Sequence, residues 1–264
     1  MNREDLLLFK QWFPGYCASF YTSDEEDRRN LALKEEHTAR VCANILNIAR
    51  EESLCSGDTM IAEAAALFHD IGRFPQYAKY KTFMDSLSVN HGELGAKELA
   101  GTGILNSLPV HEQEIITTAV KFHNAFKIPD LGCRDTIIFL KLVRDADKLD
   151  IWRIFSEYYS KDSTKNMPSA VGLGFPDTPG YSRKVLDCIL NKQLISLAML
   201  KTLNDFKLTK LSWVYDLNFR SSLRMAAKDN YIDGVAATLP QTYEIRKAVE
   251  FLHEYIRRKL EGGL

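Results

Sequence analysis

Apolar residues recur at intervals of three and four positions along nearly the whole chain, and strict alternation of apolar and polar residues is scarce. The first spacing puts apolar side chains on one face of an α-helix, whereas a half-buried strand needs alternation. Inspection of the sequence reveals no tandem repeat. The pattern therefore predicts an all-α fold, in which helices bury their apolar faces against one another.

Residues that start or stop helices divide this pattern into elements. Ser23 lies three residues before Glu26, which is a capping-box spacing, and Asp58 can cap a further helix. Pro14 and, later, Gly72 are expected to end helices. The predicted helices of the first part of the chain then cover positions 3–12, 23–52, 58–68, 90–100, 111–123 and 134–159.

Residues 166–181 are rich in proline and glycine and are predicted to form a loop. Loops of that length are uncommon and often functional. Three or four further helices are predicted after it, the last over residues 242–260. We expect residues 1–160 to form a catalytic core. Residues 161–264 should supply the loop and C-terminal helices that pack on this core, in a single compact domain.

Composition and charge remove several classes of protein. Hydrophobic residues make up 45% and charged residues 26%, as in soluble globular proteins. Apolar stretches are far shorter than the roughly 20 residues that cross a bilayer, so no membrane partner is expected. The 34 basic residues balance 35 acidic ones, which gives no strong nucleic-acid signal. The N-terminus does not resemble a secretion signal, so a cytoplasmic location is expected. The sequence gives no indication of the oligomeric state.

The five cysteines are scattered and odd in number, which argues against a disulfide framework or a thiolate zinc site and favours reduced thiols. A more informative feature is the doublet His69-Asp70 at the end of an alanine-rich helix. Adjacent side chains on a helix diverge by about 100°, but at a helix end they can converge. An imidazole beside a carboxylate suits Mn, Fe, Co, Ni or Zn. The alternative is a capping histidine with a solvated aspartate.

Three other histidines strengthen the metal interpretation. His37 lies one turn before Val41 on the inward stripe of its helix, and His123 follows Val120 on another. His91 opens a predicted helix. Taken singly, His37 and His123 could bond a buried carbonyl, and His91 could lie on the surface. Together these imidazoles would each need a buried partner unless they share a cation.

An aspartate cluster interrupts the most apolar predicted helix. Asp145 and Asp147 fall on opposite apolar stripes, so periodicity does not choose between them. Burying a carboxylate is costly unless a cation compensates it. The alternative to a metal is a structural ion pair with Arg144 or Lys148.

The order of these residues resembles the HD-domain superfamily of metal-dependent phosphohydrolases. The resemblance covers roughly residues 37–154, and it selects Asp147 over Asp145. Its motifs are Phe68-His69-Asp70-Ile71-Gly72-Arg73, Asp145-Ala146-Asp147-Lys148-Leu149 and, as in two-metal members, His91-Gly92-Glu93-Leu94-Gly95-Ala96. The sequence departs from the cyclic-dinucleotide phosphodiesterases of this superfamily in two ways. No Gly-Tyr-Pro motif follows His123, and Asn124 stands where a second consecutive histidine is expected.

The resemblance implies an HD-like helical bundle that holds one or two divalent ions: Mn, Fe, Ni, Co or Zn, with Mg possible. The first ion would be held by His37, His69, Asp70 and Asp147, and Asp70 would bridge to a second ion held by His91 and His123. Metal-activated water would then cleave a small-molecule phosphate ester, which could be a nucleotide, a phosphomonoester or a phosphodiester.

We expect Asp70, Arg73 and Lys148 to act in catalysis, with the two basic residues binding phosphate. Either basic residue could equally be a structural charge. One alternative function is an HD-type di-iron oxygenase similar to myo-inositol oxygenase, and another is a non-catalytic metal-stabilised ligand-binding module. Specificity should come from residues 166–181 and the C-terminal helices. The aromatic residues Tyr77, Tyr80 and Phe83 could stack on a base or simply pack in the core.

Overall fold

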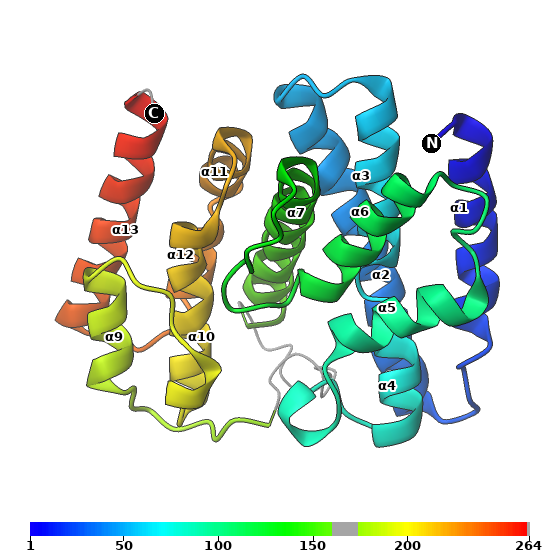
Figure 1. Cartoon of the computed structure of the whole chain (residues 1–264). Coiled ribbons are helices and arrows are strands. Elements are labelled where there is room, and N and C mark those ends of the chain that lie inside the picture. Colours follow the sequence, from blue (N-terminus) through cyan, green and yellow to red (C-terminus); the bar gives the residue numbers. More distant parts are fainter. Residues whose placement is uncertain (160–173, 263–264) are drawn as a thin grey trace. The chain divides into compact units, whose positions relative to one another are not determined.

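The computed structural model describes residues 1–159 and 174–262, and every regular element in these two ranges is a helix (Figure 1). The all-α prediction is therefore confirmed. The chain forms two compact units, Met1–Asp147 and Lys148–Leu264. The predicted boundary at residue 160, and the packing of the C-terminal helices on the core, stay predictions. No helix in the described ranges is long and apolar enough to span a membrane.

The first unit is built around α3 (Ser56–Phe68), which packs against three other helices. Most of α3 is buried, and many of its side chains are alanines, so neighbouring backbones can approach it from several sides. The surrounding helices are α1 (Arg3–Ala18), α2 (Glu25–Glu51), α4 (Arg73–Tyr80), α5 (His91–Thr102), α6 (Val110–Phe122) and the first part of α7 (Arg134–Tyr159). This packing places the C-terminus of α3 inside the unit.

Helix α1 is longer than predicted, because Pro14 lies inside it. A proline lacks the amide hydrogen of one helical bond, but the turns on both sides are held by packing. Phe13 packs edge-on against Phe68 and Phe74, with ring centroids 6.4 and 5.9 Å apart, and Cys17 is fully buried. The prediction that α1 ends at Pro14 was wrong because this tertiary packing extends the helix.

Helix α4 was not predicted as an element, although it directly follows the doublet. Its residues Phe74 and Tyr77 are buried at helical spacing, and Tyr77 stacks on Phe83 with ring centroids 4.8 Å apart. Tyr77 and Phe83 therefore pack in the core. The short helix η1 (Asp85–Leu87) connects α4 to α5.

The second unit contains more helices than the three or four that were predicted. In its described part, the helices after residue 181 are α9 (Arg183–Leu190), η3 (Leu197–Met199), α10 (Leu203–Ser212), η4 (Trp213–Asp216), α11 (Arg220–Lys228), α12 (Tyr231–Ala236) and α13 (Tyr243–Glu261). Asn230 adopts a positive φ of 53° between α11 and α12, and so splits a stretch that helical periodicity reads as one element. Within the predicted loop, residues 166–173 lie outside the described residues.

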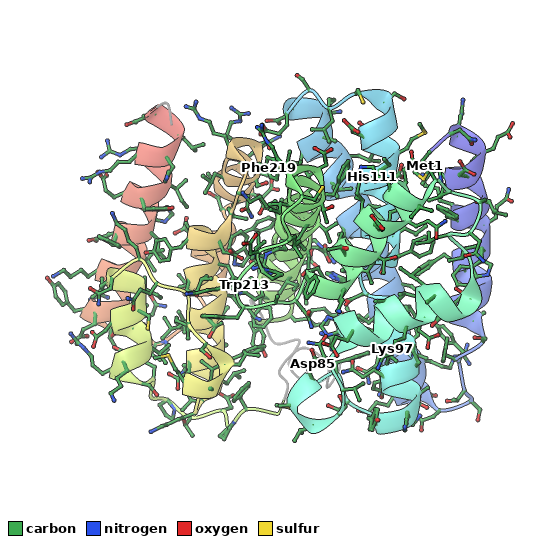
Figure 2. All side chains as sticks on the ribbon, in the orientation of Figure 1. Met1, Asp85, Lys97, His111, Trp213 and Phe219 are labelled. Atoms are coloured by element: carbon green, nitrogen blue, oxygen red, sulfur yellow. The ribbon has the colours of Figure 1, made fainter. Side chains whose placement is uncertain are left out.

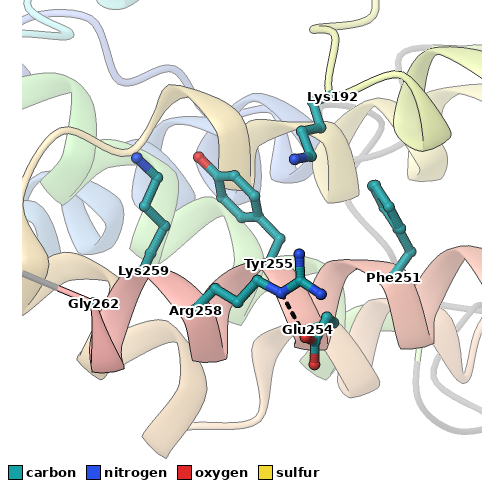
Figure 3. Close-up of a pocket in the computed structure, with 7 residues that line it drawn as sticks. All are labelled: Lys192, Phe251, Glu254, Tyr255, Arg258, Lys259 and Gly262. Carbon is teal, nitrogen blue, oxygen red and sulfur yellow. Dashed lines mark hydrogen bonds and ion pairs between the residues drawn. The ribbon is translucent and has the colours of Figure 1, made fainter. Parts of the chain in front are cut away.

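A surface pocket of about 470 Å³ lies in the second unit, beside α13 (Figure 3). It is lined by Lys192, Phe251, Glu254, Tyr255, Arg258, Lys259 and Gly262. None of the residues predicted to hold metal or phosphate lines it, so the candidate chemistry lies elsewhere. All five cysteines are free, as expected.

Candidate metal centre

The six predicted metal ligands come from five helices and one turn of the first unit. His37 lies on α2 and Asp147 on α7, whereas His69 and His123 are the C-cap residues of α3 and α6. His91 is the first residue of α5, and Asp70 follows His69 in the turn before α4. Each histidine is at most 5% exposed and Asp70 is 3% exposed. Helix ends thus bring most of these side chains to one buried region.

Gly72 allows the turn after the doublet to pack closely against α5. Its φ of −67° is ordinary for any residue, so this turn does not need the conformational freedom of glycine. A Cβ atom at position 72 would instead collide with the carbonyl oxygen of His91 and lie 2.5 Å from the Gly95 nitrogen. Gly72 is therefore required for space, and this close approach brings His91 to the His69-Asp70 doublet.

The first group of ligand atoms surrounds one carboxylate oxygen of Asp70. The Nε2 atoms of His37 and His69 are 3.2 Å apart, and each lies 3.7 Å from Asp70 Oδ2. Asp147 Oδ1 lies 3.1 Å from His37 Nε2. The structure thus places Asp147 beside this group, where the resemblance put it.

The second group surrounds the other oxygen of the same carboxylate. The Nε2 atoms of His91 and His123 are 3.0 Å apart, and they lie 3.4 and 3.5 Å from Asp70 Oδ1. Asp70 therefore presents one oxygen to each group of histidines. Both groups have the spacing of residues that hold a metal ion.

Hydrogen bonds at the outer ring nitrogens determine where the lone pairs point. His69 Nδ1 donates to Ala66 O at 2.7 Å, and His123 Nδ1 donates to Val120 O at 2.8 Å. His91 Nδ1 donates to the Asp85 carboxylate at 2.7 Å. Since each Nδ1 carries the proton, each Nε2 presents a lone pair to the centre. Lone pairs that face one another at 3.0 Å repel unless a cation lies between them, so these residues fit a divalent metal ion.

The Asp70 carboxylate is held in its charged form. Lys34 Nζ lies 2.7 Å from Asp70 Oδ2, and Arg73 Nε lies 3.4 Å from Oδ1. Burial by itself raises the pKa of Asp70, but the nearby charges, led by Lys34, together hold it well below the usual value. For Asp147, burial also raises the pKa, but the neighbouring histidines together, led by His37, outweigh burial and lower it.

The imidazoles of His69 and His91 are neutral near pH 7. Burial lowers the pKa of His69 to about 4, and burial together with the charge of Arg73 lowers the pKa of His91 to about 3. A neutral imidazole is the form that binds a metal ion, so both rings are ready to act as ligands.

Sequence reasoning missed two residues of the centre, Lys34 and Asp85. Lys34 lies one turn before His37 on α2, and this helical spacing could have revealed it. Asp85 precedes His91 by six residues through an irregular connection, so no periodicity indicates it. Lys34 and Arg73 are each 15% exposed and Asp85 is 31% exposed. These three side chains are therefore partly accessible to solvent beside the buried histidines.

The remaining candidates lie apart from these contacts. Lys148 Nζ forms a 2.8 Å ion pair with Asp216, within the second unit. His111 is exposed at the first turn of α6, whose other end carries His123 (Figure 2). His253 pairs with Asp233 on the surface at 2.8 Å. The structure gives neither His111 nor His253 a place at the centre.

The first unit is thus all-helical, and it buries two groups of histidines around Asp70 that could hold a metal ion. Comparison with protein families matches residues 35–152 to the HD domain. This match spans all six candidate ligands, and the histidine and aspartate cluster fits a metal site of the kind found in HD domains. No curated protein and no solved structure matched the chain.

Proposed function

We propose that this protein is a two-metal phosphohydrolase that cleaves a small phosphate ester, such as a phosphomonoester or nucleotide. The observation that carries the proposal is the shared Asp70 carboxylate, whose two oxygens each face a separate pair of histidine Nε2 atoms. Two divalent ions held there would supply hydroxide from bound water at neutral pH and neutralise phosphoryl oxygens. Mn, Fe, Co, Ni and Zn all suit such imidazole and carboxylate ligands.

The positive side chains of Lys34 and Arg73 beside the centre favour an anionic substrate. Lys34 and Arg73 flank Asp70, and both lie near the Phe83 ring, at 5.4 and 5.7 Å from its centroid. The Arg73 Nε atom is buried and makes no hydrogen bond, since its 3.4 Å approach to Asp70 Oδ1 is an ion-pair contact only. A phosphoryl oxygen that accepted this hydrogen would give the buried donor a hydrogen-bond partner.

The residues of the centre then have separate roles. Asp70 and Asp147 would supply carboxylate ligands, and the imidazoles of His37, His69, His91 and His123 would supply nitrogen ligands. Arg73 and Lys34 bind and orient phosphoryl oxygens. Lys148 remains a proposed phosphate-binding residue, and it also forms an ion pair with Asp216.

Replacing Asp70 with alanine tests this proposal. Because one carboxylate serves both groups of histidines, Asp70→Ala should remove bound metal and abolish hydrolysis of p-nitrophenyl phosphate and nucleoside monophosphates. Asp233→Ala, which removes an exposed carboxylate from another Asp–His pair, should leave both properties unchanged. Undiminished hydrolysis by the Asp70→Ala protein would reject the proposal.

The same preparation separates the phosphohydrolase from its alternatives. Elemental analysis identifies the metal, and an oxygen electrode with inositol-like or phosphonate substrates measures dioxygen consumption. Oxygen uptake with a di-iron centre would indicate an HD-type oxygenase. Retained metal without turnover of any phosphate ester or consumption of oxygen would indicate a non-catalytic binding module. The cations at Lys34 and Arg73 lead us to expect phosphate-ester hydrolysis.

A further inference from the structure

Asp85 holds the ring of His91 in the second group of ligands. It lies in η1 between α4 and α5 and is labelled in Figure 2. His91 Nδ1 is 2.7 Å from Asp85 Oδ2 and 2.9 Å from Oδ1, so both carboxylate oxygens can accept its proton. The opposite ring nitrogen, Nε2, faces His123 and Asp70.

The position of His91 in its helix explains why a side chain has to supply this acceptor. His69 and His123 are C-cap residues, and each donates to the carbonyl three residues earlier in its own helix, Ala66 O or Val120 O. His91 is the first residue of α5, so no helical turn precedes it to offer a carbonyl. Its acceptor must come from outside the helix, and Asp85 provides it.

We propose that Asp85 is a positioning residue that keeps the proton of His91 on Nδ1, so that Nε2 remains free to bind the second metal ion. The inference rests on the two-metal function proposed above. An ionised carboxylate only accepts hydrogen bonds, so it requires a proton on Nδ1. An amide at position 85 would carry an NH₂ group, which could donate to Nδ1 and favour the tautomer with its proton on Nε2. That tautomer has no lone pair on Nε2 with which to bind the second metal ion.

Three donors fix the orientation of the Asp85 carboxylate. Arg73 Nη1 lies 3.1 Å from Oδ1 and Gln76 Nε2 lies 2.9 Å from it, whereas Asn124 Nδ2 lies 3.1 Å from Oδ2.

Gln76 also connects η1 to the start of α5. It is fully buried, and its Nε2 donates to Val89 O and Ser88 Oγ as well. Asn124 Nδ2 is 3.2 Å from His91 Nδ1 as well, but the Nδ1 proton points to the closer carboxylate. Asp85 therefore joins the second metal group to Arg73.

Metal binding by full-length Asp85→Asn protein provides the first half of the test. The change keeps the size of the side chain and removes its charge, and equilibrium dialysis of the apoprotein against Mn²⁺ measures how many ions bind and how tightly. Loss of such a partner of a ligating histidine typically weakens metal affinity 10- to 100-fold. We expect this weakening for the second Mn²⁺ ion only. The control Asp233→Asn makes the same change in the surface Asp–His pair and should bind both ions as the wild type does.

The tautomer of His91 in the apoprotein provides the second half. The chain has 6 histidines, so long-range ¹H–¹⁵N spectra of their rings can be resolved, and His91→Gln assigns the signal. The wild type should show His91 protonated on Nδ1, and Asp85→Asn should shift the proton toward Nε2. A shift together with a weaker second site supports the inference.

Other outcomes overturn the inference or, separately, the function. An unchanged tautomer in the Asp85→Asn protein overturns the inference, even if metal binding weakens, because Asp85 would then only stabilise the local fold. A second site within about threefold of wild type overturns it as well. If wild-type protein binds a single Mn²⁺ ion, the two-metal function fails instead, and the tautomer comparison still decides whether Asp85 controls His91.

Discussion

The position of the proton on each imidazole determines which ring nitrogen can bind a cation. Backbone carbonyls accept the Nδ1 protons of His69 and His123, and a carboxylate accepts the Nδ1 proton of His91. In every case Nε2 turns inward without a proton. This common orientation, and not merely the presence of several histidines, gives the centre the chemistry of a metal site.

Arg73 is the residue at which the phosphate interaction is best tested. We expect Arg73→Lys to lower kcat/KM for phosphomonoester hydrolysis by 10- to 100-fold, about 1.4–2.7 kcal/mol. Lysine keeps the charge but lacks the planar fork and the buried Nε donor of arginine. Steady-state kinetics at saturating Mn²⁺ measure the effect.

A matched change at an exposed position controls for the general effect of replacing arginine with lysine. Arg40 lies on α2 and is 57% exposed, near Glu36. Arg40→Lys should leave kcat/KM unchanged. Wild-type kinetics in the Arg73→Lys protein would contradict the assignment of Arg73 as a phosphate-binding residue.

At the scale of elements, glycines set the distance between the doublet and α5. Besides Gly72, position 92 has no room for a side chain, because a Cβ atom there would lie 2.5 Å from Lys121 O of α6. Close packing of these backbones brings His91 to both His123 and Asp70. Motifs around the doublet and His91 contain these glycines, but their spatial role depends on contacts between segments distant in sequence.

Adding a methyl group at Gly72 should therefore disturb the second group of ligands. We expect Gly72→Ala to lower the free energy of unfolding by about 1–3 kcal/mol, as overpacking in a dense interior does. The second Mn²⁺ ion should also bind more weakly, because His91 would be pushed away from Asp70. Urea denaturation and equilibrium dialysis measure the two effects.

Gly101 provides the control for this change in the same helix, α5. A Cβ atom at position 101 would have nothing within 4 Å, so Gly101→Ala should be neutral or stabilise by up to about 1 kcal/mol through helix propensity. Equal stability of the Gly72→Ala and Gly101→Ala proteins would show that the contact at Gly72 has been misjudged.

At the scale of the whole molecule, the proposed ligands all belong to the first compact unit, Met1–Asp147. Without metal this unit buries several imidazole lone pairs and two carboxylates close together. A metal ion that binds the folded state but not the unfolded state stabilises the fold by about 2.7 kcal/mol when its free concentration is one hundred times its Kd. Metal should therefore act mainly on the stability of the first unit.

Hydrogen exchange with and without metal tests this expectation. Removal of metal with EDTA should lower Tm and speed amide exchange in α2, α3, α5 and α6, since these helices carry the histidines. Exchange in α9 to α13, which contain none of the proposed ligands, should change much less. Re-addition of Mn²⁺ should restore protection. Equal changes across both units would contradict a centre confined to the first.

The sequence alone determined the helical class and the residue types of the centre. Helical periodicity is local, so it predicted most helices of the first unit closely, and α7 matches its predicted bounds. Inward stripes indicated His37 and His123 for the same reason. The resemblance to HD domains then selected Asp147, a choice that periodicity left open.

Only the tertiary structure decided how these residues meet. That Asp70 turns one oxygen to each histidine pair, that Lys34 flanks it, and that Asp85 holds His91 all depend on contacts between distant segments. The continuation of α1 through Pro14 depends on packing in the same way. Helical spacing predicts which face of its own helix a residue occupies. It does not predict which other helix that face contacts, because this contact depends on the packing of the whole unit.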